Sequence, residues 1–105
     1  MWFIFPQIAG LGQSPTSVFY ALSSLDEAKA YLAHPVLGSR MRECTQLALD
    51  VEGRSARDIF GPVDEMKFRS SMTLFMKAAP DEPLFAQCLD KYFDGKPDPA
   101  TLEKL

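Results

Sequence analysis

Apolar residues recur along most of the chain at the spacing of an amphipathic helix. The clearest case follows Pro35 and comprises Leu37, Met41, Cys44, Ala48 and Val51. These positions advance by alternating steps of four and three residues, which places their side chains on one face of an α-helix. A second run has similar spacing at Phe68, Met72, Phe75 and Ala79. No segment shows the sustained alternation of a β-strand. The pattern therefore predicts an all-α fold.

Capping residues, prolines and glycines divide the chain into a compact stack of about six short helices. Residues suited to the N-cap position mark the expected starts at Ser14, Ser24, Ser55, Asp64, Asp81 and Asp98. The expected ends are marked by Gly53, Gly61, Pro80 and Gly95. Pro35 separates the helix that begins after Ser24 from the amphipathic one, because the residue before a proline avoids the α region.

The inward positions of these helices define one expected core. Its members are Leu37, Met41, Cys44, Phe68, Met72, Phe75, Phe85, Cys88 and Leu89. Gly38 falls in the first turns of its helix, where glycine costs about 1 kcal/mol relative to alanine. A glycine at such a position often permits a close approach of another backbone segment.

The first residues are apolar from the start, with Trp2, Phe3, Ile4 and Phe5 in succession. Pro6 limits helix formation here, so we expect an extended apolar arm. Each aromatic side chain needs roughly 150–250 Å² of covering surface. Either the arm folds back onto the downstream helices, or two chains bury their arms against each other. We expect residues 1–105 to form a single domain that lacks N-terminal elements and that self-associates through this arm.

Composition and charge narrow the classes of function. The formal net charge is −3 and the basic residues are dispersed, which argues against a nucleic-acid partner. The apolar start has no basic region and is too short to span a membrane, so we expect no membrane partner and a cytoplasmic location. Cys44 and Cys88 lie singly inside helical patterns and are expected to be free thiols. The single histidine and the two cysteines have no metal-ligand spacing, and we expect neither a metal nor another cofactor.

Four strings of residues, in this order and spacing, carry a resemblance to a known family. They are WFIFPQ at 2–7, GLGQS at 10–14, AYLAHPVLG at 30–38 and KFRSSMTLF at 67–75. Together they resemble the domain-of-unknown-function family 1810, small bacterial proteins of which some carry a calpastatin label. The resemblance spans essentially the whole chain and implies stacked helices with no established activity. Members of that family usually have further helices before the segment that begins here at Trp2, and this is the basis for expecting missing N-terminal elements.

The polar residues with the best prospects for chemistry form one candidate ligand-binding set: Gln7, Ser17, Tyr20, His34, Lys67, Ser70 and Ser71. His34 is the only histidine, the residue type best suited to acid–base chemistry near neutral pH, but it is also suited to cap the helix after Pro35. Lys67 and Ser71 are one helical turn apart and could bind an anion. The alternative is that the two serines are small residues at a helix–helix contact. No catalytic residue can be assigned.

Two classes of function remain open. The first is a helical module that binds a protein or a small polar ligand. The second is an enzyme that acts on a small polar or nucleotide-derived compound through Tyr20, His34, Lys67 and the serine pair. Convergence of these side chains on one concave site would favour the second class.

Overall fold

The computed structural model describes Phe5, Ala21, Leu22 and residues 24–105. The elements in this part of the chain are all helices: α2 (Leu25–Ala33), α3 (Leu37–Asp50), α4 (Ala56–Ala78), α5 (Pro83–Phe93) and α6 (Pro99–Lys104). The fold is all-α, as the sequence predicts. The helix expected after Ser14 and most of the apolar arm lie outside the described residues.

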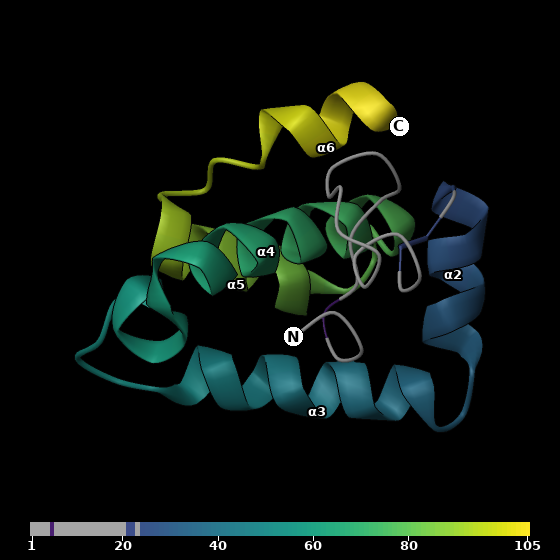
Figure 1. Ribbon diagram of the computed structural model, residues 1–105. Coiled ribbons are helices and arrows are strands. Elements are labelled where there is room, and N and C mark those ends of the chain that lie inside the picture. The colour runs from purple at the N-terminus through teal and green to yellow at the C-terminus, as the bar shows by residue number, and fades with distance from the viewer. Residues whose placement is uncertain (1–4, 6–20, 23) are drawn as a thin grey trace.

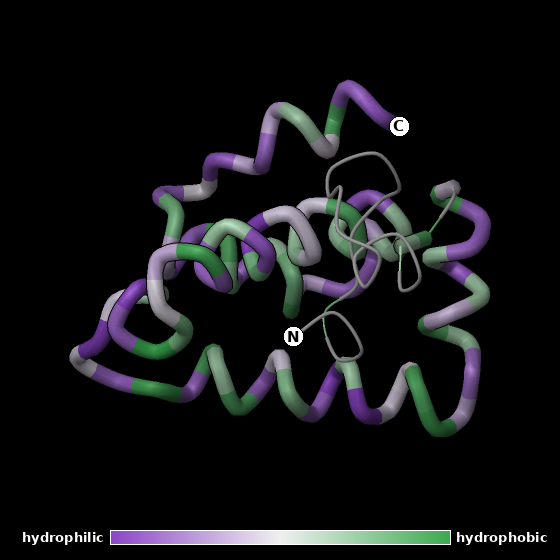
Figure 2. Tube along the Cα trace, in the orientation of Figure 1, coloured by the Kyte–Doolittle hydropathy of each residue, from purple (hydrophilic) through white to green (hydrophobic). Residues whose placement is uncertain are grey.

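Helix α4 is the central element of the fold (Figure 1). It contacts α2, α5 and α6, while α3 contacts α2 and α5. In Figure 1, α3 and α6 lie on opposite sides of the α4–α5 pair. Hydrophobic and hydrophilic residues alternate around α3 in Figure 2, as expected for a helix with one buried face. The buried face of α3 comprises Gly38, Met41, Thr45 and Ala48, whereas the buried residue of α6 is Thr101.

The core that the sequence predicts is confirmed, with two members at its edge. Fully buried members of the predicted set are Met41, Phe68, Met72, Phe75, Phe85, Cys88 and Leu89. Cys44 is half-buried against this cluster, and Leu37 is also half-buried. Both cysteines are free, as expected.

Phe5, the described residue of the apolar arm, packs into the core. Its side chain is buried, and its ring centroid lies 5.1 Å from that of Phe68 and 6.2 Å from that of Phe60, both edge-on. At this position the arm folds back onto the downstream helices. Trp2, Phe3 and Ile4 lie outside the described residues.

Helix α4 contains a break that corrects one expected boundary. Gly61 has φ 83° and ψ 164°, outside the helical region, and Pro62 begins the second part of the element. The first part begins at Ser55, as predicted, and the structure shows a capping box between Ser55 and Asp58 there. The expected cap at Asp64 is wrong, because proline at position 62 already fits the first turn of a helix. Asp64 instead pairs with Lys67, with 3.5 Å between Oδ1 and Nζ.

The start of α5 corrects a second boundary. Asp81 was the expected cap, but the helix begins at Pro83 and Glu82 takes the N-cap position without a side-chain capping bond. The Glu82 carboxylate instead accepts hydrogen bonds from the Arg42 guanidinium of α3, the shortest at 2.7 Å from Nη2 to Oε1. Arg42 also donates from Nη1 to the Leu32 carbonyl of α2 at 3.0 Å. This single side chain joins three helices.

Candidate functional site

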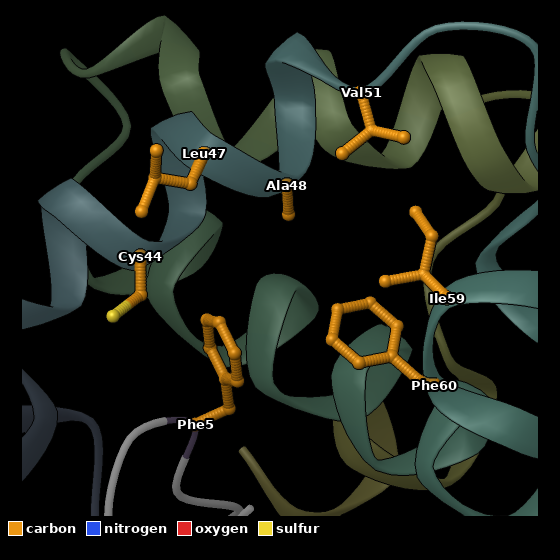
Figure 3. A pocket seen from close by; sticks show the side chains of 7 residues that line it. All are labelled: Phe5, Cys44, Leu47, Ala48, Val51, Ile59 and Phe60. Atoms are coloured by element: carbon orange, nitrogen blue, oxygen red, sulfur yellow. The ribbon is translucent and has the colours of Figure 1, made fainter.

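A surface pocket lies between the C-terminal half of α3 and the first turns of α4 (Figure 3). Its volume is about 270 Å³, and its walls are formed by Phe5, Cys44, Leu47, Ala48, Val51, Ile59 and Phe60. The α3 residues come from two successive turns of one helix face. Ile59 and Phe60 face them from across the pocket, and Phe5 completes the lining. Three separate segments of the chain therefore build this pocket.

Local sequence signals position the pocket wall that α4 provides. The capping box at Ser55 starts α4 immediately before Ile59 and Phe60, and the break at Gly61 ends that short stretch of helix. An ion pair across the break, with 3.4 Å from Arg57 Nε to Glu65 Oε2, joins its two parts. The Phe60 ring stacks on Phe68 with centroids 4.7 Å apart, which holds this wall against the core.

Side chains of α5 form hydrogen bonds with the end of α3 that lines the pocket. Lys91 donates from Nζ to the carbonyls of Leu49 and Val51, and Tyr92 donates its hydroxyl to the Ala48 carbonyl. These carbonyl groups lie at the C-terminal end of α3, where no further backbone N–H of the helix is available to donate to them. Burial raises the pKa of the Tyr92 hydroxyl, and the nearby Cys88 adds to this shift. The end of α3 that lines the pocket is thus anchored by hydrogen bonds.

The pocket is apolar in all its walls. Six of its seven lining side chains are hydrocarbon, and the seventh is the Cys44 thiol, a weak hydrogen-bonding group. A polar ligand would lose its hydration here without gaining partners, which costs roughly 1–3 kcal/mol per group. An apolar group would gain from the same burial. The pocket therefore favours an apolar occupant.

Charged residues surround the mouth of this pocket. Leu47 is 63% exposed although it lines the pocket, so the pocket opens to solvent beside it. Glu43 and Asp50 lie four residues before and three residues after Leu47, on the same stripe of α3. Glu52 lies two residues after the last residue of α3 and is also exposed. The α3 side of the mouth is acidic.

The predicted polar site residues occupy several different positions. Gln7, Ser17 and Tyr20 lie outside the described residues. His34 forms the corner between α2 and α3, where its Nδ1 accepts hydrogen bonds from the backbone N–H groups of Val36 and Leu37, both at 3.2 Å. It is exposed and caps the start of α3, which is the structural interpretation of this residue. None of the described members of the predicted set lines the apolar pocket.

Ser70 takes part in a contact between α4 and the segment leading into α6. Its hydroxyl contacts Asp98 Oδ2 at 3.2 Å and the Met66 carbonyl at 3.0 Å. Asp98 in turn caps α6 by accepting from the Thr101 backbone N–H at 3.0 Å, as the sequence predicts. Arg69 donates to the Lys96 and Pro97 carbonyls beside it. Ser70 therefore serves helix packing in this structure.

Ser71 differs from its neighbour because its hydroxyl oxygen is fully buried and has no hydrogen-bond partner in the described part of the chain. Leaving such a group unpaired costs about 1–3 kcal/mol. We expect Ser71→Ala to raise the free energy of unfolding by about 1 kcal/mol, since alanine removes the unpaired group and is the better helix former. Urea unfolding followed by circular dichroism measures the change.

Ser70→Ala is the matched control, because it removes, one residue away, a hydroxyl whose single proton has two acceptors within reach. We expect it to lower the free energy of unfolding by about 1 kcal/mol. A Ser71→Ala variant that is less stable than the wild type would contradict the prediction and would indicate a partner for this hydroxyl.

The two thiols differ in environment. Cys44 lines the pocket, whereas Cys88 is fully buried with its Sγ 3.8 Å from the Thr45 carbonyl oxygen. Burial raises the pKa of the Cys88 thiol from 9.0 to about 11, opposed in part by the Lys91 ammonium. In the folded protein, Cys88 is therefore a protonated thiol at neutral pH.

This shift predicts a loss of stability in alkaline solution. Between pH 9 and about 11 the unfolded thiol is ionised while the folded one still binds its proton. Unfolding then releases a proton, so the free energy of unfolding falls as pH rises, by up to about 3 kcal/mol across this window. Urea unfolding at a series of pH values measures this, with Cys88→Ala as the comparison. Parallel pH profiles for the two proteins would show that the thiol does not contribute.

Sequence reasoning did not identify the pocket residues as a site. It placed Cys44 in the core and did not assign Leu47, Ile59 or Phe60 to any site. The one feature of the sequence that could have indicated the pocket is Leu47. It lies beside the predicted apolar face of α3 and extends that face toward solvent. A widened apolar face indicates additional contact surface, but it does not indicate what packs there.

The described residues contain neither a cluster of metal-ligating side chains nor a helix suited to a membrane. No group of three or more His, Cys, Asp or Glu side chains among them is placed to hold a metal ion. None of the described helices is both long and apolar enough to cross a membrane.

Comparisons with known proteins place the chain among proteins of unknown function. A family model described as "Protein of unknown function (DUF1810)" matches residues 1–105. The chain is also similar to a solved structure, that of the conserved hypothetical protein Rv1873 from Mycobacterium tuberculosis. The identity is 51% and the TM-score is 0.97, over 99% of this chain and 74% of that one. No curated protein matches the chain.

Proposed function

This chain belongs to the DUF1810 family of proteins of unknown function, and we propose that it is a helical interaction module whose α3–α4 pocket receives an apolar side chain of a protein partner. The observation that carries the proposal is the open apolar pocket described above. A cavity of about 150 Å³ holds benzene, whereas pockets for drug-sized ligands begin at about 300 Å³. A volume of about 270 Å³ suits one large apolar side chain.

The position of the pocket supports a protein partner over an enclosed small molecule. Sites for small molecules bury most of the ligand surface. Here a wall residue, Leu47, is itself largely exposed, so an occupant would remain open to solvent on one side. Apolar anchors that enter such grooves from a partner helix are a recurring mode of protein recognition.

The alternative function, an enzyme for a small polar compound, has less support. Such an enzyme needs polar groups that converge on the substrate. The pocket offers one thiol among apolar side chains, and His34 and Ser70 both make structural hydrogen bonds elsewhere.

The two free thiols favour a reducing compartment, and we propose that the protein is located in the cytoplasm.

The proposal is tested with single-residue probes that imitate an anchor. N-acetyl-tryptophanamide and N-acetyl-leucinamide are titrated into ¹⁵N-labelled protein, with N-acetyl-asparaginamide as the polar comparison. We expect the apolar probes to shift the amide resonances of the lining residues with dissociation constants on the order of 1 mM, equivalent to about −4 kcal/mol. The polar probe is expected to leave these resonances unchanged.

Two variants with the same chemical change locate the binding. Leu47→Asp places a carboxylate at the mouth of the pocket and is expected to abolish the probe-induced shifts. Leu105→Asp makes the same change at another exposed leucine, close to α6 and on the opposite side of the molecule, and is expected to leave them intact. Equal shifts with the polar probe, or no shifts with the apolar probes, would overturn the proposed function.

A further inference from the structure

We infer that the partner segment received by the α3–α4 pocket carries lysine or arginine beside its apolar anchor, on the side that faces α3. This inference rests on the proposed function and adds the charge of the partner. The charge of the partner is inferred from the ionised groups around the mouth of the pocket, because the apolar walls do not select for charge.

The α3 side of the mouth presents two carboxylates in line with its exposed leucine. Glu43 and Asp50 lie one helical turn on either side of Leu47, and both are exposed. Asp50 Oδ1 accepts a hydrogen bond of 2.9 Å from the Gln46 side chain, a neutral donor that leaves its charge in place. No ion pair involves either carboxylate among the described residues. An anchor in the pocket would therefore lie beside two available negative charges.

The opposite side of the mouth does not offset this charge. Arg57 is paired with Glu65 at 3.4 Å, and its neighbour Asp58 is a further carboxylate, which caps the Ser55 backbone N–H. The cations that remain near the mouth are Arg54, in the connection between the two helices, and Lys91 of α5, whose Nζ binds the Leu49 and Val51 carbonyls at the end of α3. Four carboxylates that form no ion pair among the described residues, those of Glu43, Asp50, Glu52 and Asp58, outnumber these two cations.

Helix α3 itself carries two cations, Arg40 and Arg42, and Arg42 is bound to Glu82 at the start of α5. Arg40 lies three residues before Glu43 and seven before Leu47, at the end of α3 that meets α2. Burial raises the pKa of the Tyr31 hydroxyl, and the charge of Arg40 opposes that shift, so Arg40 acts on Tyr31 at that end of the helix. The whole chain carries a formal net charge of −3, so the wider field of the protein also attracts a basic segment.

Charges at the rim of an interface mainly select the partner and speed its approach. They remain solvated, so each favourable pair changes affinity only modestly, and salt weakens the effect. For two carboxylates that attract a basic segment and repel an acidic one, we expect the combined preference to be about tenfold at low ionic strength.

Three synthetic helical peptides test this inference. The first carries a central tryptophan with lysines one turn before and after it, and the second has glutamates in place of the lysines. The third keeps the lysines and has alanine in place of the tryptophan. Dissociation constants are measured by fluorescence anisotropy at about 50 mM and about 500 mM salt. We expect the basic tryptophan peptide to bind most tightly, with the preference over the acidic one shrinking at the higher salt.

A charge reversal on the protein supplies the decisive comparison. In the double variant Glu43→Lys and Asp50→Lys, we expect the acidic tryptophan peptide to bind more tightly than the basic one. The control is Asp81→Lys with Glu103→Lys, which changes the net charge equally at exposed positions that do not line the pocket. This control is expected to keep the preference of the wild type.

The peptide affinities distinguish a failure of the charge inference from a failure of the proposed function. If both tryptophan peptides bind equally and more tightly than the alanine peptide, the charge inference is overturned and the proposed function stands. If the alanine peptide binds as tightly as the basic tryptophan peptide, the apolar anchor is irrelevant and both fail.

Two other occupants would also overturn the inference. If sedimentation velocity shows a dimer that Leu47→Asp dissociates, the occupant is a second copy of this chain, the self-association that the apolar start led us to expect. If no peptide binds more tightly than N-acetyl-tryptophanamide alone, the pocket takes a small apolar molecule.

Discussion

Replacing Phe75 with alanine is expected to lower the free energy of unfolding by about 3–5 kcal/mol. The side chain is fully buried in α4, and its ring centroid lies 5.6 Å from that of Tyr31 in α2 and 5.8 Å from that of Phe85 in α5. Its loss would open a cavity where three helices meet. Because a domain of this size has a total stability of roughly 5–15 kcal/mol, the variant is expected to approach the limit of folding. Urea unfolding followed by circular dichroism measures the change.

Lys77→Ala is the control, two residues further along the same helix. This side chain is exposed, so we expect a change within about 0.5 kcal/mol. A loss of less than about 1 kcal/mol for Phe75→Ala would mean that the neighbouring side chains collapse into the space and that the ring is not the centre of the core.

Gly38→Ala is expected to destabilise the protein by about 3 kcal/mol, although alanine is the better helix former by about 1 kcal/mol. A Cβ atom at this position would lie 2.0 Å from the Leu32 carbonyl oxygen, a backbone atom of α2. That carbonyl also accepts the hydrogen bond from Arg42, so the two helices cannot separate without disturbing the contact that joins them to α5. Thermal and urea unfolding of the variant test the sign.

Ser39→Ala is the matched control in the next position of α3. Ser39 is exposed, and helix propensity alone predicts a neutral or slightly stabilising change. A Gly38→Ala protein as stable as the wild type would contradict the close approach of α2 and α3 at this position.

Local signals in the sequence were sufficient to identify most of the helices. Ser24 accepts from the Glu27 N–H, Ser55 and Asp58 form a complete capping box, and Asp98 caps α6. Each of these contacts joins residues three positions apart. The spacing of apolar residues likewise identified seven buried core side chains, because helix periodicity alone decides which residues share a face.

The wrong boundaries arose where a distant residue or a proline changed a local preference. Asp64 did not cap the second part of α4, because Gly61 and Pro62 already begin it there. Glu82 took the start of α5 in place of Asp81, with its carboxylate bound to Arg42, forty residues away. Local capping preferences cannot report a partner at that separation.

The sequence by itself determined an all-α fold, the faces that the helices bury, and two free thiols. Only the tertiary structure decided which surfaces meet, and this is why the apolar pocket was not predicted. Phe5, Leu47 and Phe60 come from three segments that share no local spacing, and they line one cavity because Phe5 packs between α3 and α4. Helix periodicity acts over a few residues, whereas a pocket depends on how whole helices are placed against each other.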